Sequence, residues 1–394
     1  MKKEVLNRIQ RVLDEMVDTH FVSGVNCLIL KDGKEQCYFE AGLRDEEGKR
    51  PFERNTICRL YSMTKPVTSA AVMILLERGL IDLVEPISKY IPSFANPYGY
   101  ENGQRVEYNR EVLIKDLLNM TSGVSYPNDT DEAGKAADVI MQEVIEKLDT
   151  PKALKTVEIA KRFGETPRSF KPASQWRYGF SADILGALVE IVSGKRFGDF
   201  LREEIFTPLG MKDTDFYVPE DKQGRFAKVY RTVGNELELF TFPNLGISNE
   251  MKQYPAFESG GAGLASTIDD YARFTQMLLN GGILDGKRIL SERTVLFMTG
   301  GKLEKHQQQP FDDWMGMEGF SYANLVKVMQ EPERACMMCS KGNYGWDGWL
   351  GTNMINDPVE NMTILMMHQK VDSGTTEYTR RIHNIAYAAL EGEE

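Results

Sequence analysis

The stretch "RLYSMTKPVTSAAVMILLERG", residues 59–79, places Ser62 three positions before Lys65 at the start of a run of apolar residues. A helix that is apolar on all sides is usually buried. The spacing puts the two side chains one turn apart on the same helical face. Two interpretations are open: Ser62 caps the helix while Lys65 points to water, or the two residues are a nucleophile and its base. In the second case, burial would lower the pKa of Lys65 towards that of a useful base.

The helical context of Ser62 and the scarcity of histidine favour the catalytic interpretation. A Ser-x-x-Lys pair is a weak signal alone, because about one occurs by chance in a chain of this composition. Here, however, the positive end of the helix dipole lies at Ser62, whose N–H is free to bind an oxyanion. The chain has four His residues, and none of its Ser residues lies in Gly-x-Ser-x-Gly. A Ser-His-Asp triad stays an open alternative that nothing supports, so the sequence favours a Lys/Tyr base.

Tyr178 and the stretch "YGWDGWLGT", residues 344–352, are two further candidates for a site. Tyr178 precedes an apolar helix that begins with Ser181, so it lies at the end of a loop. A Tyr hydroxyl beside a Lys ammonium can have its pKa lowered and serve as a proton shuttle. The glycines of 344–352 allow the close backbone approach that an oxyanion-hole strand requires. The alternatives are a Tyr that only packs and a Gly-kinked strand that only packs.

The charge of the chain limits its partners. Its 394 residues carry a net charge of −11 at pH 7, and no local Lys/Arg cluster compensates for it. Nucleic acids and anionic membranes both need a basic face, so we expect neither as a partner. The longest apolar stretch is far too short to span a membrane. Residues 1–21 predict an amphipathic helix of the mature fold rather than a signal sequence, and we therefore expect a cytoplasmic protein.

Two of the five cysteines flank a predicted hairpin turn. Cys27 and Cys37 lie on either side of the Asp-Gly pair at 32–33, which is typical of a two-residue turn. In the simple register of such a hairpin, Leu28 faces Cys37 and Cys27 faces Tyr38. The two thiols would then lie on opposite faces of the sheet and could not pair. The odd number of cysteines in a long chain does not predict a disulfide framework either.

The segment 300–343 matches no motif, although it lies just before the candidate oxyanion strand and could shape the pocket. It contains a lone Cys-x-x-Cys, Cys336 and Cys339, without a second Cys pair or a nearby His. Metal and redox sites normally need such additional ligands. We therefore expect reduced, structural thiols and no metal or redox site in this segment.

The order of the predicted elements indicates an α+β fold. Strand-like runs at 24–30 and 35–43 are matched by others at 345–357 and 362–370, near the opposite end of the chain. Residues from 80 to 255 predict mainly helices separated by Pro, Gly and Asn loops. We expect one sheet domain built from 1–79 and 256–394, with an all-helical domain inserted at 80–255 and the active site between them.

Taken together, these residues resemble the serine β-lactamase/penicillin-binding-protein superfamily. Within it, the class C-like branch of carboxylesterases (the family VIII esterases) and acyltransferases is the most similar. The resemblance runs from about residue 20 to the C-terminus and rests on five stretches in the family's order. These are "RLYSMTKPVTSAAVMILLERGLIDLVEPISKYIP" (59–92), "LLNMTSGVSY" (117–126), "PLGMKDTDFYV" (208–218), "ESGGAGLASTIDDYARFTQMLLNGG" (258–282) and "YGWDGWLGT" (344–352).

The resemblance implies a role for each matching residue. Ser62 would be the acylated nucleophile, activated by Lys65 together with Tyr178. The same two residues would return the proton to the leaving group and activate the deacylating water. The backbone N–H groups of Ser62 and Trp349 would form the oxyanion hole. No metal or organic cofactor is implied. The implied fold is a mostly antiparallel sheet flanked by helices, as in β-lactamases and transpeptidases, plus an all-helical domain.

Departures from the family pattern bear on the substrate. β-Lactamases and D,D-peptidases of this type have Tyr-x-Asn, whereas Phe180 stands at the third position here, and "YGFSAD" (178–183) resembles the form found in the esterase-like branch. The Lys/His-Thr-Gly triplet, whose cation helps to bind a substrate carboxylate, is replaced by Trp346-Asp347-Gly348. Losing a cation and gaining an anion disfavour a penicillin or a D-Ala-D-Ala terminus.

The resemblance also implies an apolar substrate pocket suited to acyl chains or aryl groups. Its expected walls are Tyr126, Phe180, Trp346 and Trp349. The negative charge of Asp347 would allow the pocket to bind a cationic group on the substrate. We therefore expect a serine hydrolase that cleaves small-molecule carboxylic esters. The alternatives are β-lactam or D,D-peptidase-like amide hydrolysis, acyl transfer to an alcohol or amine, and a non-catalytic homologue that binds a ligand, against which the intact set of catalytic residues argues.

Overall fold

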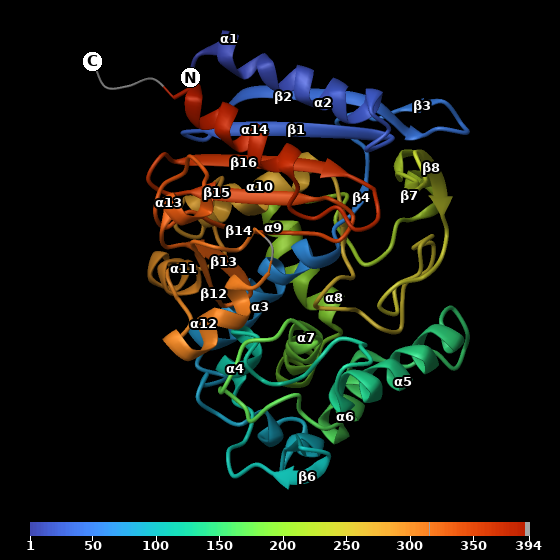
Figure 1. The fold of residues 1–394 in the computed structure, drawn as a ribbon, viewed down its shortest axis with the longest axis vertical. Helices are drawn as coiled ribbons and strands as arrows, with labels where there is room; N and C mark the ends of the chain where they lie inside the picture. Colours follow the sequence, from blue (N-terminus) through green and yellow to red (C-terminus); the bar gives the residue numbers. More distant parts are fainter. Residues whose placement is uncertain (315, 391–394) are drawn as a thin grey trace.

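The computed structural model describes residues 1–314 and 316–390 and is built on an eight-stranded antiparallel sheet (Figure 1). The strand order is β12-β13-β14-β15-β16-β1-β2-β3, so the N-terminal strands pair with the C-terminal ones through β1 and β16. This confirms the predicted sheet built from both parts of the chain. Its strands are β1 (Gly24–Lys31), β2 (Lys34–Asp45), β3 (Arg50–Pro51), β12 (Phe320–Ala323), β13 (Val326–Met329), β14 (Tyr344–Asp347), β15 (Asn353–Asp357) and β16 (Met362–His368).

Helices cover both faces of this sheet. On one face, α1 (Lys3–Leu6), α2 (Arg8–Asp18) and α14 (Glu377–Ala388) bury their apolar sides against β1, β2 and β16. Figure 1 shows these three helices together at one end of the molecule. On the other face, α3 (Thr64–Glu77) and α10 (Ile268–Leu279) belong to the large core. None of the helices described in 1–314 and 316–390 has both the length and the apolar character needed to cross a membrane.

The middle of the chain contains helices and two hairpins. Its helices are α4 (Ile114–Leu118), α5 (Glu132–Lys147), α6 (Thr156–Glu165), α7 (Ser181–Ser193), α8 (Phe197–Leu201) and α9 (Thr207–Leu209), with η2 (Ile87–Lys89), η3 (Pro92–Phe94), η4 (Arg202–Phe206) and η5 (Glu220–Arg225) as short helical turns. The hairpins are β5 (Tyr98–Glu101) with β6 (Gln104–Glu107), and β7 (Val229–Val233) with β8 (Glu236–Phe240). The prediction of an all-helical segment was therefore wrong at these hairpins. Asn102-Gly103, both with positive φ, is a hairpin signal that was missed.

The remaining elements are short and flank the sheet. They are β4 (Cys58–Arg59), η1 (Tyr61–Met63), β9 (Ala265–Ser266), β10 (Ile283–Leu284), β11 (Lys287–Arg288), α11 (Glu292–Thr299), α12 (Lys305–Asp312) and α13 (Pro332–Ala335). The division of the chain at residues 79/80 and 255/256 stays a prediction.

The register of the first hairpin corrects the prediction for its cysteines. The turn is the expected Asp32-Gly33 pair, but the register shifts next to Ile29, so that Cys37 lies opposite Ile29 and Cys27 opposite Phe39. A one-residue bulge moves every following side chain to the other face. Both thiols therefore lie on the same face, against the core beneath α2, and both are free.

Helix α3 is buried along nearly its whole length, as its apolar sequence predicts. Every side chain from Thr64 to Leu75 is buried, including that of Lys65. The helix ends at Glu77, and Gly79 follows its C-cap with a φ of +66°, which suits glycine at this position. It passes through the large core, and its N-terminus follows directly from η1, which carries Ser62. The fold therefore holds the start of α3 in a fixed, largely dry environment.

Candidate active site

Ser62 lies in a strained turn at the entrance to α3. The preceding residue, Tyr61, has a φ of +44°, a left-handed conformation that costs a bulky residue about 1 kcal/mol or more. Its buried ring packs against the Trp349 ring, with the centroids 5.0 Å apart. Ser62 itself is half-buried and occupies the first turn of η1, where backbone N–H groups have no carbonyl of their own helix to bind. Its N–H is therefore available to a ligand oxygen.

Lys65 is fully buried and directly contacts the Ser62 hydroxyl. Its ammonium nitrogen Nζ donates to Ser62 Oγ at 3.1 Å, to the Gly261 carbonyl at 2.8 Å and to the Tyr126 hydroxyl at 3.3 Å. All three acceptors are uncharged, so no carboxylate binds the ammonium directly. The first interpretation of the sequence, in which Lys65 points to water, is wrong.

Burial lowers the pKa of Lys65 to about 7, while the charges of Asp183 and Asp347 oppose the shift. Desolvation penalises the ammonium more than these two carboxylates stabilise it. At neutral pH, a large fraction of Lys65 is therefore the free amine, which can accept a proton from Ser62 Oγ 3.1 Å away. This is the protonation state that a general base needs.

Tyr178 completes the cluster from the loop before α7. Its hydroxyl accepts a hydrogen bond from Trp346 Nε1 at 2.9 Å, and Lys65 Nζ lies 4.4 Å from the centre of its ring. Burial raises the pKa of Tyr178, and hydrogen bonds with Ser62 and Trp346 only partly oppose this. The prediction that Lys65 lowers this pKa was wrong, because the ammonium lies over the ring face and burial dominates. Tyr178 is a neutral phenol that can donate or relay a proton.

Three of the four residues that were predicted to line the substrate pocket lie elsewhere: Phe180, Trp346 and Trp349. Phe180 is fully buried, stacked on Phe163 and in edge contact with Tyr126, with centroids 4.6 Å apart in each case. Trp346 is also fully buried, behind Tyr178. The Trp349 indole turns towards Asp372, to which it donates at 2.6 Å. Phe180 and Trp346 therefore support the aromatic rings that face the site and do not line it themselves.

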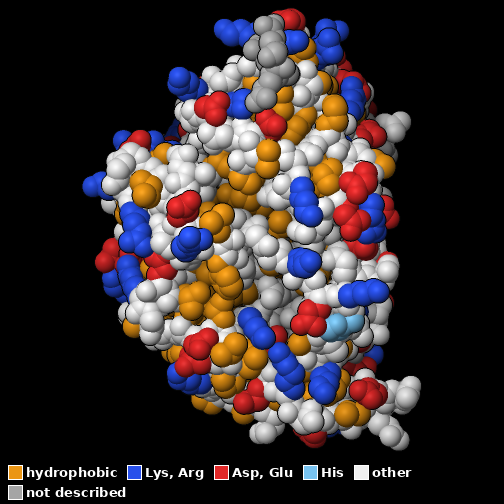
Figure 2. Space-filling view, turned by 90° about the vertical axis from the view of Figure 1, so that its left-hand side faces the viewer, with side chains coloured by type: hydrophobic (Ala, Val, Ile, Leu, Met, Phe, Trp, Pro, Cys, Tyr) orange, Lys and Arg blue, Asp and Glu red, His pale blue; other side chains and the backbone are white. Residues whose placement is uncertain are grey.

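The cleft next to Tyr126 and Tyr178 has a volume of about 460 Å³. Its other walls include Trp176 and Trp314, whose rings lie 6.1 Å and 4.9 Å from that of Tyr178. Trp314 is 40% exposed and follows α12, in the segment that matched no motif. Sequence reasoning missed it, because only a tertiary contact places it beside Tyr178. Figure 2 shows the left-hand side of the view in Figure 1, where hydrophobic side chains gather down the middle of the face with Lys and Arg side chains beside them.

The turn after β14 brings the backbone of 348–349 against the chain just before Ser62. A Cβ atom at Gly348 would lie 2.2 Å from the Leu60 carbonyl oxygen, which is too close for any residue but glycine. The Thr352 hydroxyl donates to the same oxygen at 2.9 Å. This is the close approach expected of an oxyanion-hole strand. The role of the Trp349 N–H as an oxyanion donor stays a prediction.

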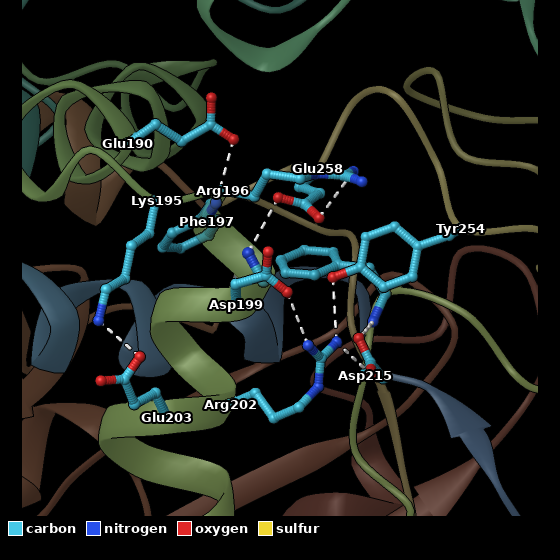
Figure 3. A network of polar contacts seen from close by, with 12 residues as sticks. Glu190, Lys195, Arg196, Phe197, Asp199, Arg202, Glu203, Asp215, Tyr254 and Glu258 are labelled. Carbon is cyan, nitrogen blue, oxygen red and sulfur yellow. Dashed lines mark hydrogen bonds and ion pairs between the residues drawn. The ribbon is translucent and has the colours of Figure 1, made fainter.

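The loop that contains Gly261 is held in place by contacts of two carboxylates, Asp183 and Glu258. Asp183 Oδ1 accepts from the Ser259 hydroxyl at 2.5 Å and from the Gly261 N–H at 3.2 Å. Buried Glu258 contacts Arg196 at 3.0 Å and accepts from the Gly198 N–H at 2.9 Å. Figure 3 shows the contacts of Glu258 and Arg196 at the start of α8. The sequence analysis did not assign Asp183 a role. An acidic residue near the start of an apolar helix was a signal that could have indicated one.

Two other kinds of site find no support in the described part of the chain. Within 1–314 and 316–390, no group of three or more His, Cys, Asp or Glu residues is placed to hold a metal ion. The histidines described there do not hydrogen-bond to Ser62, and burial lowers the pKa of both His368 and His383 to about 3. The titratable group that contacts the Ser62 hydroxyl is the Lys65 ammonium, at 3.1 Å.

Comparison with known proteins agrees with this geometry. The sequence matches the Beta-lactamase family over residues 9–389. It is 26% identical to Esterase EstB of Burkholderia gladioli over 91% of this chain and 89% of that one. It is 28% identical to a D-alanyl-D-alanine carboxypeptidase-like protein of Escherichia coli K12, over 94% and 83%. The solved structure of EstCE1, a hydrolase with promiscuous acyltransferase activity, superposes with a TM-score of 0.80 at 23% identity, over 98% and 99%.

Proposed function

This chain belongs to the Beta-lactamase family, a serine hydrolase superfamily with esterase and carboxypeptidase relatives, and from that premise we propose that it cleaves carboxylic esters through an acyl-enzyme on Ser62. The observation that carries the proposal is the buried contact between Lys65 and Ser62. A lysine whose pKa is lowered to about 7 lies 3.1 Å from the hydroxyl, with no carboxylate bound to its ammonium. Such a contact fits a base better than a structural cation.

In the proposed acylation, Lys65 acts first as the base and then as the source of the leaving group's proton. The Lys65 amine takes the proton of Ser62, whose Oγ attacks the ester carbonyl, and the Ser62 and Trp349 N–H groups hold the oxyanion. Collapse breaks the bond to the alkoxide, which receives its proton through the Tyr178 phenol from the Lys65 ammonium. A water then attacks the acyl-enzyme and gives its proton to Lys65. The bond to Ser62 Oγ breaks, the acid leaves, and Ser62 Oγ takes this proton back from Lys65.

Three features support an ester over a β-lactam. Trp346 stands where the family has its carboxylate-binding cation, and Asp347 follows it, so the triplet offers an anion and no cation. The walls of the cleft near Tyr178 include the aromatic residues Tyr126, Trp176 and Trp314, which can contact an acyl or aryl group. The similarity to Esterase EstB points to the same chemistry.

Amide hydrolysis is the second candidate, favoured by the similarity to the carboxypeptidase-like protein of E. coli. The same acyl-enzyme could also pass its acyl group to an alcohol or an amine in place of water. A non-catalytic homologue would have no need of a depressed lysine pKa beside a serine. These candidates differ in the substrate that is turned over, so a single panel of substrates separates them.

The test is a panel of p-nitrophenyl esters of increasing acyl length, nitrocefin and D-amino-acid peptides, assayed with the wild type and Ser62→Ala. We expect ester turnover in the wild type, a loss of at least about 10³-fold in Ser62→Ala, and little turnover of nitrocefin or the peptides. Strong nitrocefin turnover with negligible esterase activity would contradict the proposal. Equal ester turnover by Ser62→Ala would do so as well.

A further inference from the structure

Asp347 is not free to meet a cationic substrate, which corrects the expectation from the sequence. Its carboxylate accepts a hydrogen bond from the Thr375 hydroxyl, and its Oδ2 lies 3.8 Å from Lys327 Nζ. The Lys327 ammonium in turn donates to Thr375 Oγ1 at 3.2 Å. The three side chains form a continuous relay from the lysine through the hydroxyl to the carboxylate, and Lys327 is only 2% exposed.

The position of Lys327 follows from the sheet register. On β13, it lies opposite Gly345 of β14, two residues before Asp347. Burial lowers the pKa of Lys327, whereas the charge of Asp347 and its hydrogen bond raise it. A buried ammonium is costly unless an anion accompanies it, so Lys327 and Asp347 depend on each other.

Asp347 also acts on the candidate catalytic groups. It directly precedes Gly348, and its negative charge raises the pKa of both Lys65 and Tyr178. The other groups that face Lys65 are Asp183 of α7, the Tyr126 hydroxyl and the ring face of Tyr178. Of the two carboxylates whose charges act on Lys65, only Asp347 has a buried cation of the protein at 3.8 Å.

We propose that Lys327, held through Thr375, is a positioning residue that fixes Asp347 beside the active site and partly neutralises the negative charge that Lys65 meets. The inference rests on the proposed function, because it concerns the protonation of the same base. No substrate contact is assigned to Lys327, since its side chain is buried. The pair would set the pH range in which Lys65 is a free amine, and hence the pH range of ester turnover.

The sign of the expected effect follows from Coulomb's law. Asp347→Asn removes a negative charge, so the Lys65 ammonium loses stabilisation and its pKa falls. Lys327→Met leaves the Asp347 charge without its partner, so the pKa of Lys65 rises. The base is active when neutral, and activity therefore appears at lower pH in Asp347→Asn and at higher pH in Lys327→Met. His383 also faces Lys327, but burial holds its pKa near 3, well below this range.

The test is the pH dependence of kcat/KM for p-nitrophenyl acetate in the wild type, Lys327→Met, Asp347→Asn and the double variant. We expect the acid limb of the profile, where kcat/KM rises with pH, to move in opposite directions in the two single variants, by up to about one pH unit. In the double variant, the acid limb should lie between those of the two single variants. Thr375→Val is a milder second variant that should move the limb in the same direction as Lys327→Met. The matched controls are Glu15→Gln and Arg381→Gln, which break an exposed ion pair of 2.7 Å between α2 and α14 and should leave the limb in place.

The result that overturns the inference is a change in kcat/KM at all pH values with no movement of the limb in any of the variants. That would show a structural role for the pair. A shift in the same direction in both single variants would also overturn it. If Lys327→Met does not fold, the profiles of Asp347→Asn and Thr375→Val decide. Failure of the proposed function is distinct, because Ser62→Ala would then hydrolyse the ester as fast as the wild type.

Discussion

Lys65→Met is expected to lower kcat/KM for esters by about 10³-fold, because it removes the base beside Ser62. Methionine has a similar shape and suits a buried position, so the core around α3 should keep its packing. In the wild type, kcat/KM should rise with pH through about 7, the pKa to which burial lowers Lys65. The measurement is kcat/KM for a p-nitrophenyl ester from pH 5 to 9, with thermal unfolding as a check on folding.

Lys370→Met is a suitable control for this variant. Burial also lowers the pKa of Lys370, but its ammonium lies over the Phe21 ring, at 4.5 Å from the ring centre, and has no contact with Ser62. We expect near wild-type turnover from it. If Lys65→Met kept more than a tenth of the wild-type kcat/KM with the same pH profile, Lys65 would not be the base.

The second large effect is expected for Tyr178→Phe, with kcat/KM lowered by about 10²- to 10³-fold. The phenol that relays the proton to the leaving group is lost, while the ring contacts with Trp346 and Trp314 are kept. The indole N–H of Trp346 loses its acceptor, which should cost about 1–3 kcal/mol of stability. Turnover of esters with good and poor leaving groups is the measurement, and the loss should be larger for the poor ones.

Tyr322→Phe provides the matched control. The Tyr322 ring also packs against Trp346, at 5.0 Å between centroids, and its buried hydroxyl has no hydrogen-bond partner in the structure. Removing that hydroxyl should leave kcat/KM unchanged. Equal losses in the two variants would assign the effect to packing around Trp346, and an unchanged rate in Tyr178→Phe would remove Tyr178 from the mechanism.

The sequence predicted the parts of the fold that depend on local patterns. The apolar run after Lys65 became a buried helix, and the Asp32-Gly33 turn formed where expected. The register of that hairpin was wrong, because the bulge beside Ile29 depends on packing of the two strands and has no local signal. The sheet built from both parts of the chain was correct because strands flank a helix-rich segment, whereas its antiparallel arrangement was implied by the family resemblance.

The candidate site was predictable as a set of residues but not as an arrangement. The pattern placed Ser62, Lys65 and Tyr178 in one cluster, where the structure has them. It could not show that Phe180 and Trp346 lie behind the aromatic wall, because burial depends on the tertiary fold. For the same reason, Lys327 carried no signal: its partner Asp347 lies on a neighbouring strand, twenty residues further along the chain.

The central claim, a nucleophilic Ser62 activated by Lys65, is tested most directly by covalent labelling with a fluorophosphonate probe, followed by mass spectrometry of the intact protein and its peptides. We predict one adduct per chain on the peptide that contains Ser62, and no adduct in Ser62→Ala. Lys65→Met should be labelled far more slowly than the wild type, because its serine hydroxyl lacks the base. No labelling of the wild type, or equal labelling of Ser62→Ala, would contradict the account.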